Sequence, residues 1–269
     1  MHHLQRPDGR IAYDLHGAGN TGTLVICVPG MFDHRSSFRF VAAALAEAGN
    51  RVAVMDLRGH GDSDTTFERY DSRVAAGDVV ALAEELGGGK VVVAGNSMGA
   101  AAATIAALDR PDLVSGIALL GPFLRPGVQS RLQRASLRLL VSGPWMARGL
   151  TMVYDSLHKG RVPEGHAEQK ARVHAMLRPA ERRRAVARTI GVTNETIDDA
   201  SGLSARAVVI MGELDPDWKD PRAEADWVAS VVRGDVVMVP DCGHYAQSQR
   251  PDVVVPALVD LIEKAEAVA

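Results

Sequence analysis

Cysteine is scarce in this sequence of 269 residues, which holds only Cys27 and Cys242. Two cysteines so far apart give neither the framework of a disulfide-stabilised domain nor the paired spacing of a cysteine zinc site. A chain that needs no disulfide is typical of a reducing compartment. We therefore predict a cytoplasmic location.

An excess of one charge sign is lacking too, and so is a long apolar run. The formal net charge is −3, which argues against a nucleic-acid-binding surface over the whole protein. The longest uncharged run, residues 91–108, is interrupted by Gly95, Asn96, Ser97 and Gly99, and this pattern indicates a strand, a turn and a helix rather than a membrane span. The first residues lack the apolar region of a secretion signal. We expect no nucleic-acid partner and no stable membrane insertion.

The sequence contains instead a repeated alternation of short β-branched runs with helix-like segments. Six runs are typical of strands buried on both faces: residues 23–28, 51–56, 90–95, 116–121, 207–212 and 235–240. Helices are expected at residues 37–48, 72–86, 98–108, 223–232 and 251–267. This alternation predicts an α/β fold with a mostly parallel central sheet flanked by helices.

The alternation stops between residues 123 and 200. This segment has a helical pattern, and its basic residues outnumber its acidic ones, whereas the rest of the chain is acidic. A segment this long with its own charge balance is better explained as an inserted helical unit than as a loop. We predict a core formed by residues 1–122 and 201–269 and a helical cap formed by residues 123–200.

Arginines with helical spacing occur twice in the predicted cap. Arg131, Arg134 and Arg138 share one helix face, and residues 182–184 are three consecutive arginines. A basic amphipathic helix suits an anionic partner, a membrane surface, or a cap helix whose arginines are solvated. We favour the solvated arginines.

The pentapeptide GNSMG, residues 95–99, joins a valine-rich run to an alanine-rich helical segment. A sharp turn from strand to helix exposes a serine hydroxyl, and small neighbours are needed there to avoid clashes. At the start of that helix the amide of Met98 would face a developing oxyanion. Ser97 is thus a candidate nucleophile, with a purely structural turn as the alternative.

An acidic segment and a histidine follow the last two predicted strands. The carboxyl ends of parallel strands meet at one edge of a sheet, where ligands bind. A serine becomes a good nucleophile when a base removes its proton, and a carboxylate must orient that base. Asp215 and His244 complete such a set with Ser97, although Glu213 and Asp217 compete with Asp215 for the acid.

These motifs, together with PGMFDHRSSF at residues 29–38 and DLRGHGDS at residues 56–63, resemble α/β-hydrolase-fold serine hydrolases with a cap, over nearly the whole length. The resemblance implies Ser97 as nucleophile, Asp215 as acid and His244 as base. It also implies that the amide of Met31 joins that of Met98 in an oxyanion hole.

One departure from the family lies in the oxyanion loop. Relatives usually carry His-Gly where this chain has Pro29 and Gly30, but the Met31 amide is retained. Serine at position 97 excludes epoxide hydrolases and haloalkane dehalogenases of this fold, which use aspartate. The GNSMG motif also resembles that of carbon–carbon bond hydrolases, whose oxyanion loop is longer and richer in glycine.

A metal site and a reactive thiol are two further alternatives. His60, Asp62 and Asp64 carry ligand atoms, but their spacing is that of a loop after a strand, so we predict no metal and no other cofactor. Cys242 is either an accessible thiol near His244 or, more commonly for a free cysteine, a buried apolar residue.

The predicted function is that of a cofactor-free carboxylic ester hydrolase. Alkoxides leave more readily than amines, and an apolar cap suits a small-molecule ester with a small or medium apolar acyl group. Candidate pocket residues are Phe32, Trp145, Met152 and Tyr245. The alternatives are a carbon–carbon bond hydrolase and a non-catalytic binder on the same fold.

Overall fold

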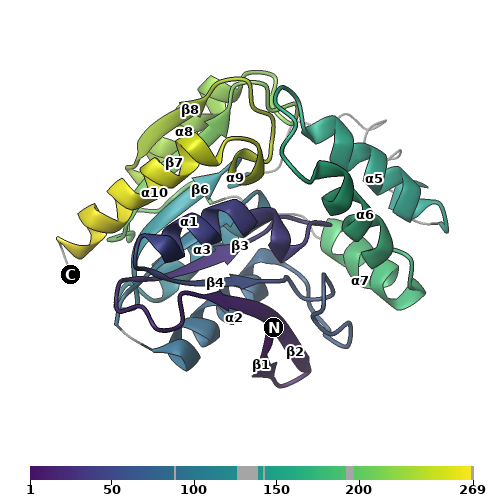
Figure 1. Cartoon of the computed structure of the whole chain (residues 1–269), viewed down its shortest axis with the longest axis horizontal. Helices are drawn as coiled ribbons and strands as arrows, with labels where there is room; N and C mark the ends of the chain where they lie inside the picture. The colour runs from purple at the N-terminus through teal and green to yellow at the C-terminus, as the bar shows by residue number, and fades with distance from the viewer. Residues whose placement is uncertain (88, 126–138, 142, 192–196, 268–269) are drawn as a thin grey trace.

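A computed structural model describes residues 1–87, 89–125, 139–141, 143–191 and 197–267. An eight-stranded sheet with the order β1-β2-β4-β3-β5-β6-β7-β8 forms its centre (Figure 1). Its strands are β1 His2–Arg6, β2 Gly9–His16, β3 Leu24–Val28, β4 Arg51–Met55, β5 Val91–Asn96, β6 Val114–Leu120, β7 Arg206–Gly212 and β8 Asp235–Val239. The pairs from β4 to β8 are parallel, whereas the β1–β2 and β2–β4 pairs are antiparallel. The predicted mostly parallel α/β sheet is confirmed.

Helices cover both faces of this sheet. One face carries η1 Arg35–Phe38, α1 Arg39–Glu47, α9 Ala246–Gln249 and α10 Pro251–Glu266. The other carries α2 Ser72–Leu86, α3 Met98–Asp109 and α8 Pro221–Val232. Asp71 and Asp220 begin α2 and α8, because each carboxylate accepts a hydrogen bond from an amide of the first turn.

The strand residues alternate between two apolar layers, as side chains of an extended strand must. On β5, Val91 and Val93 pack in the layer beneath α2 and α3, whereas Val92 and Ala94 pack in the layer beneath α1 and α10. Both layers are buried, which explains why the sequence shows continuous valine-rich runs instead of an apolar–polar alternation. Cys27 and Cys242 are completely buried and lie in the second layer.

The hairpin of β1 and β2 is the part of the sheet that the pattern of apolar runs misses. Its strands pair in register from His2 with Tyr13 to Arg6 with Gly9. Only a few of its side chains are buried, so its apolar pattern is weak. The Pro7-Asp8-Gly9 turn was the available signal, because this combination is typical of a tight turn.

Helical structure occupies most of the described part of the segment between β6 and β7, and three of its helices have described bounds. They are α5 Met146–Leu157, α6 His166–Met176 and α7 Ala180–Gly191, and they group at one side of the sheet (Figure 1). They share an apolar cluster to which Tyr245, from the loop after β8, also belongs. No helix in the described part of the chain is long and apolar enough to cross a bilayer.

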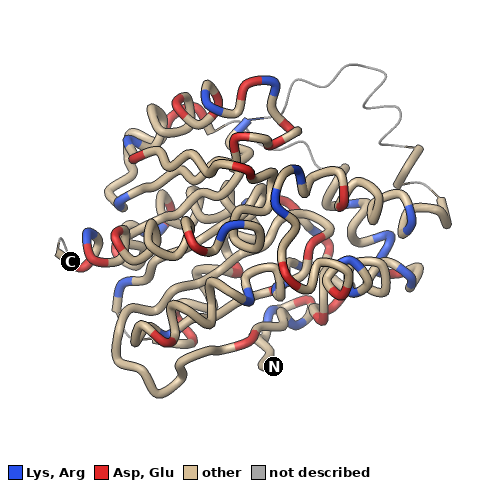
Figure 2. Tube along the Cα trace, turned by 45° about the horizontal axis from the view of Figure 1, so that its top comes forward, with Lys and Arg blue, Asp and Glu red and all other residues tan. Residues whose placement is uncertain are grey.

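Charged residues of both signs are interspersed along the described chain (Figure 2). The predicted arginine face at residues 131–138 lies outside the described residues. Of the arginine triplet, Arg184 is exposed, but Arg182 donates hydrogen bonds to the backbone oxygens of His60 and Ser63. Arg182 therefore joins α7 to the loop after β4 and is not simply solvated.

Candidate active site

Ser97 occupies a strained turn between β5 and α3. Its φ of 56° and ψ of −117° lie outside the regions favoured by a residue with a side chain. A Cβ on Gly95 would lie 2.1 Å from the Gly99 oxygen, and one on Gly99 would lie 2.3 Å from the Val28 oxygen. Both glycines of the GNSMG motif are therefore required by close backbone approach. The Ser97 amide is held by the oxygen of Leu120, at a distance of 2.9 Å.

His244 and Asp215 form a buried hydrogen-bonded pair beyond the ends of β8 and β7. The Nδ1 atom of His244 lies 2.8 Å from Oδ2 of Asp215, and both side chains are almost fully buried. Asp217 is a second carboxylate beside the same ring, with its Oδ2 atom 3.4 Å from Nδ1. The amide of Asp217 also donates to Oδ1 of Asp215 at 3.0 Å, which holds the two acids in one turn.

The two carboxylates determine the basicity of this histidine. Burial lowers the pKa of His244, but the negative charges of Asp215 and Asp217 and the hydrogen bond that the ring donates to Asp215 outweigh it and raise the pKa to about 9. Asp33 adds a smaller contribution in the same direction. Burial also raises the pKa of Asp217, although the charge of His244 opposes this effect.

Asn96 ties the serine turn to the histidine loop. Its Nδ2 atom donates to the backbone oxygens of Leu120, at 3.0 Å, and of His244, at 3.1 Å. The amide of His244 in turn donates to the oxygen of Leu157 at the end of α5, at 2.9 Å. Sequence reasoning missed Asn96, although the residue stands inside the motif that identified Ser97.

The loop after β3 is held by a histidine from the loop after β4. The Phe32 amide donates to Nε2 of His60 at 2.9 Å, and Nδ1 of His60 lies 2.9 Å from the Arg58 oxygen. Burial lowers the pKa of His60 to about 4, so the ring is neutral and its two partners fix the tautomer. Phe32 has a left-handed φ of 49°, which this hydrogen bond helps to hold.

A cavity of about 160 Å³ connects these groups. Its polar lining consists of Asn96, Ser97, Asp217, His244 and Tyr245. Its apolar lining comes from the loop after β3, the loop after β6, α5 and α7: Met31, Phe32, Phe123, Leu150, Val153, Leu157 and Ile190. The lining therefore combines a wide apolar surface with a few convergent polar groups, as small-molecule sites do.

Two of the four predicted pocket residues do not line this cavity. Phe32 and Tyr245 do, but Trp145 and Met152 are 51% and 67% exposed. The phase of α5 explains the difference, because Leu150, Val153 and Leu157 recur at helical spacing on the face toward the cavity. Met152 is turned away from that face.

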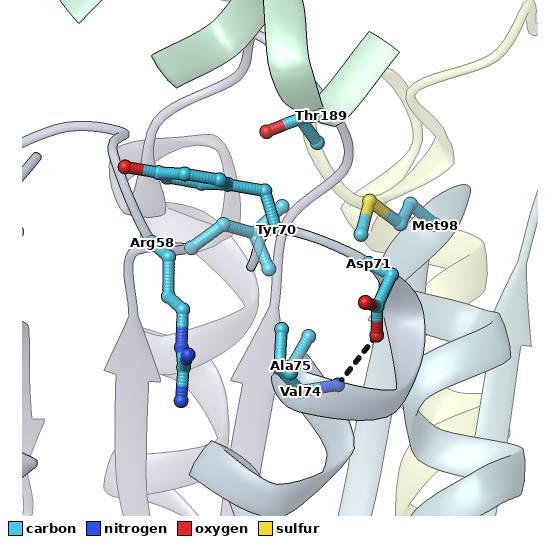
Figure 3. A pocket seen from close by; sticks show the side chains of 8 residues that line it. Arg58, Tyr70, Asp71, Val74, Ala75, Met98 and Thr189 are labelled. Carbon is cyan, nitrogen blue, oxygen red and sulfur yellow. Dashed lines mark hydrogen bonds between the residues drawn. The ribbon is translucent and has the colours of Figure 1, made fainter. Parts of the chain in front are cut away.

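A second hollow lies between α2, α7 and the loop after β4 (Figure 3). The side chain of Met98 lines it beside Tyr70 and Thr189, and the hydrogen bond from the Val74 amide to Asp71 lies at its edge. Its volume is about 10 Å³, close to the smallest space that one water molecule needs. It is too small for an organic substrate.

Two clusters among the described residues bring possible metal ligands within 4.8 Å of one another. The first joins His34, Asp56 and Asp62, but the guanidinium of Arg35 already pairs with both of these carboxylates. The second joins Asp215, Asp217 and His244, whose Nδ1 is hydrogen-bonded to Asp215. In the loop after β4, where the sequence offered His60 and Asp64 as possible metal ligands, these side chains have other partners. Asp64 pairs with Arg10, and both ring nitrogens of His60 contact the backbone.

Comparison with known proteins extends over almost the whole chain. The model of the alpha/beta hydrolase family matches residues 25–257. A 2-(acetamidomethylene)succinate hydrolase of Mesorhizobium japonicum is 26% identical over 95% of this chain and 93% of its own length. A thermophilic esterase from Thermogutta terrifontis (TM-score 0.77, 23% identity, 98% and 97% of the two chains) and an enol-lactonase from Burkholderia xenovorans (TM-score 0.79, 21% identity, 97% and 100%) share the fold. The chain therefore belongs to the alpha/beta hydrolase family, and its relatives are hydrolases.

Proposed function

We propose that this hydrolase is a serine-dependent carboxylic ester hydrolase that needs no cofactor. The observation that carries the proposal is the cavity that Ser97 and His244 both line, with the buried Asp215 hydrogen-bonded to the far side of the imidazole ring. A nucleophile, a base and a carboxylate that orients the base are the parts that acyl transfer requires.

In the proposed reaction, Nε2 of His244 removes the Ser97 proton while Oγ attacks the ester carbonyl. The amides of Met31 and Met98 hold the resulting oxyanion, and each donor contributes about 3 kcal/mol to the transition state. The protonated His244 then gives its proton to the departing alkoxide, which leaves an acyl group on Ser97. Water, deprotonated by the same ring, attacks this acyl-enzyme and releases the acid.

We assign the specificity to residues 123–200 as a cap on a core of residues 1–122 and 201–269. Leu150, Val153 and Leu157 on α5 and Ile190 on α7 supply much of the apolar lining. A cavity of about 160 Å³ suits a small or medium acyl group. Because proteins described as an esterase and an enol-lactonase share the fold, esters and lactones are the first substrates to test.

The related Mesorhizobium protein is described as a hydrolase of a succinate derivative. Among the described residues that line the cavity here, one is a carboxylate and none is a lysine or arginine. A dianionic substrate would therefore meet the negative charge of Asp217 with no lysine or arginine of the described lining to offset it. We propose an uncharged or cationic ester in place of that substrate class.

The test is the hydrolysis of p-nitrophenyl esters of increasing acyl length by the wild-type protein and the Ser97→Ala variant. We expect a clear optimum at short or medium length and no enzymatic turnover by the variant. Equal rates for both proteins would overturn the assignment of Ser97. Absence of hydrolysis at every length would overturn the esterase and favour the carbon–carbon bond hydrolase.

The pH dependence of kcat/KM for an uncharged ester is a further prediction. Because His244 acts as a base only when neutral and its pKa is raised to about 9, we expect kcat/KM to rise with pH, to reach half of its maximum near pH 9 and to level off above that pH. The same shift stabilises the folded protein below the ordinary histidine pKa of 6.5, and this contribution is lost as the pH rises through about 9. Thermal unfolding measured across the same pH range separates the change in folding stability from the change in kcat/KM. A plateau already reached at neutral pH would contradict the prediction.

A further inference from the structure

Asp217 is a charged group of the cavity that the proposed acyl transfer does not use. Its side chain is 32% exposed, and it lines the cavity together with Ser97 and His244. The only ion pair found for it among the described residues is the one with His244, at 3.4 Å. No lysine or arginine of the described lining neutralises it. A carboxylate whose only basic partner among the described residues is His244 is therefore presented to the substrate.

The combined charge of Asp215, Asp217 and His244 stays negative whether the histidine is protonated or neutral. With His244 protonated, one positive charge faces the carboxylates of Asp215 and Asp217, which leaves one negative charge in excess. When His244 is neutral, the excess is larger. Asp215 is buried behind the ring, whereas Asp217 is the carboxylate that the cavity exposes, so a bound molecule meets the excess charge at Asp217.

We propose that Asp217 is a specificity-determining residue that selects esters by charge, favouring substrates with a cationic group near the reacting carbonyl and excluding anionic ones. The proposal rests on the esterase function proposed above. A charge within several ångströms of another in a partly buried site changes binding by about tenfold or more, because the low local dielectric weakens screening. The apolar lining suits the hydrocarbon part of such a substrate, and its aromatic side chains suit a quaternary ammonium group.

Three p-nitrophenyl esters of matched shape separate charge from size. They are the esters of 4-(trimethylammonio)butanoate, of 5,5-dimethylhexanoate, which replaces the ammonium nitrogen by carbon, and of 4-sulfobutanoate. We expect kcat/KM of the wild-type protein to fall about tenfold from the cation to its uncharged isostere, and by at least as much again to the anion. In Asp217→Asn both ratios should approach one. Ratios are compared because any effect of the substitution on His244 itself cancels between substrates.

The matched control is Glu213→Gln, which removes a carboxylate from the same loop. Glu213 is exposed and does not line the cavity, so its removal changes the net charge equally but leaves the site unchanged. The wild-type ratios should persist in this variant. Unchanged ratios in Asp217→Asn, or a wild-type preference for the sulfonate, would overturn the proposal.

Binding to Ser97→Ala separates this proposal from the proposed function. This variant keeps Asp217 and does not consume the esters, so calorimetric dissociation constants report the charge preference without turnover. Tighter binding of the cationic ester, lost in the Ser97→Ala/Asp217→Asn double variant, supports charge selection even if the wild-type protein hydrolyses none of the three. Equal dissociation constants for the cation and its isostere would refute charge selection whatever the rates are.

Discussion

Replacing His244 by alanine should lower kcat for an uncharged ester by about four orders of magnitude, because no other group then removes the Ser97 proton. The fold should persist. Asp215 keeps the hydrogen bond from the Asp217 amide, and the backbone of residue 244 keeps its bonds to Leu157 and Asn96. Steady-state kinetics, with circular dichroism and thermal unfolding on the same samples, measure both expectations.

His158→Ala is the matched control for the loss of a buried imidazole in the same region. His158 stacks on Tyr245 with a centroid separation of 4.4 Å and is 7% exposed, but it does not line the cavity. This variant should lose stability through packing while kcat stays within about tenfold of the wild type. Turnover by His244→Ala at a rate similar to that of the control would remove His244 from the proposed mechanism.

The central strands and the helices that flank them could be predicted from the sequence because the sheet is buried on both sides. Valine-rich runs and alanine-rich segments report burial directly, and the predicted helix over residues 72–86 has the same bounds as α2. The β1–β2 hairpin buries only a few of its side chains, so burial left little pattern to recognise. In the segment between β6 and β7, the orientation of α5 depends on packing against neighbouring helices, and Trp145 and Met152 were therefore placed wrongly in the pocket.

The candidate site also contains residues that the sequence predicts and residues that it does not. Ser97, Asp215 and His244 each follow a strand of one parallel sheet, so the topology alone brings them to one edge. The contacts of Asn96 and His60 join loops that are far apart in the chain, and nothing in the local pattern reveals them. Asp217 was considered only as a competitor of Asp215. The structure separates the two acids by burial, since Asp215 lies behind the ring and Asp217 faces the cavity.

Asp215→Asn should therefore lower kcat by about ten thousandfold, whereas Asp217→Asn should lower it by less than about tenfold. An asparagine at 215 keeps the size of the side chain but no longer fixes the tautomer of His244 or stabilises its positive charge. Asp217 is farther from Nδ1, at 3.4 Å instead of 2.8 Å, and one-third exposed. Its loss should leave the hydrogen bond to Asp215 in place.

The two variants should also differ in their pH profiles. Asp217 is one of the groups that raise the pKa of His244 against the effect of burial, so Asp217→Asn should move the rise of kcat/KM to lower pH while it retains a similar plateau. Asp215→Asn should have a low plateau at every pH, because the orientation of the ring is lost and not only its basicity. Steady-state kinetics of both variants across the pH range measure this difference. If Asp217→Asn were the crippled variant and Asp215→Asn the active one, the orienting acid would be Asp217, and the charge that the cavity exposes would belong to the catalytic machinery itself.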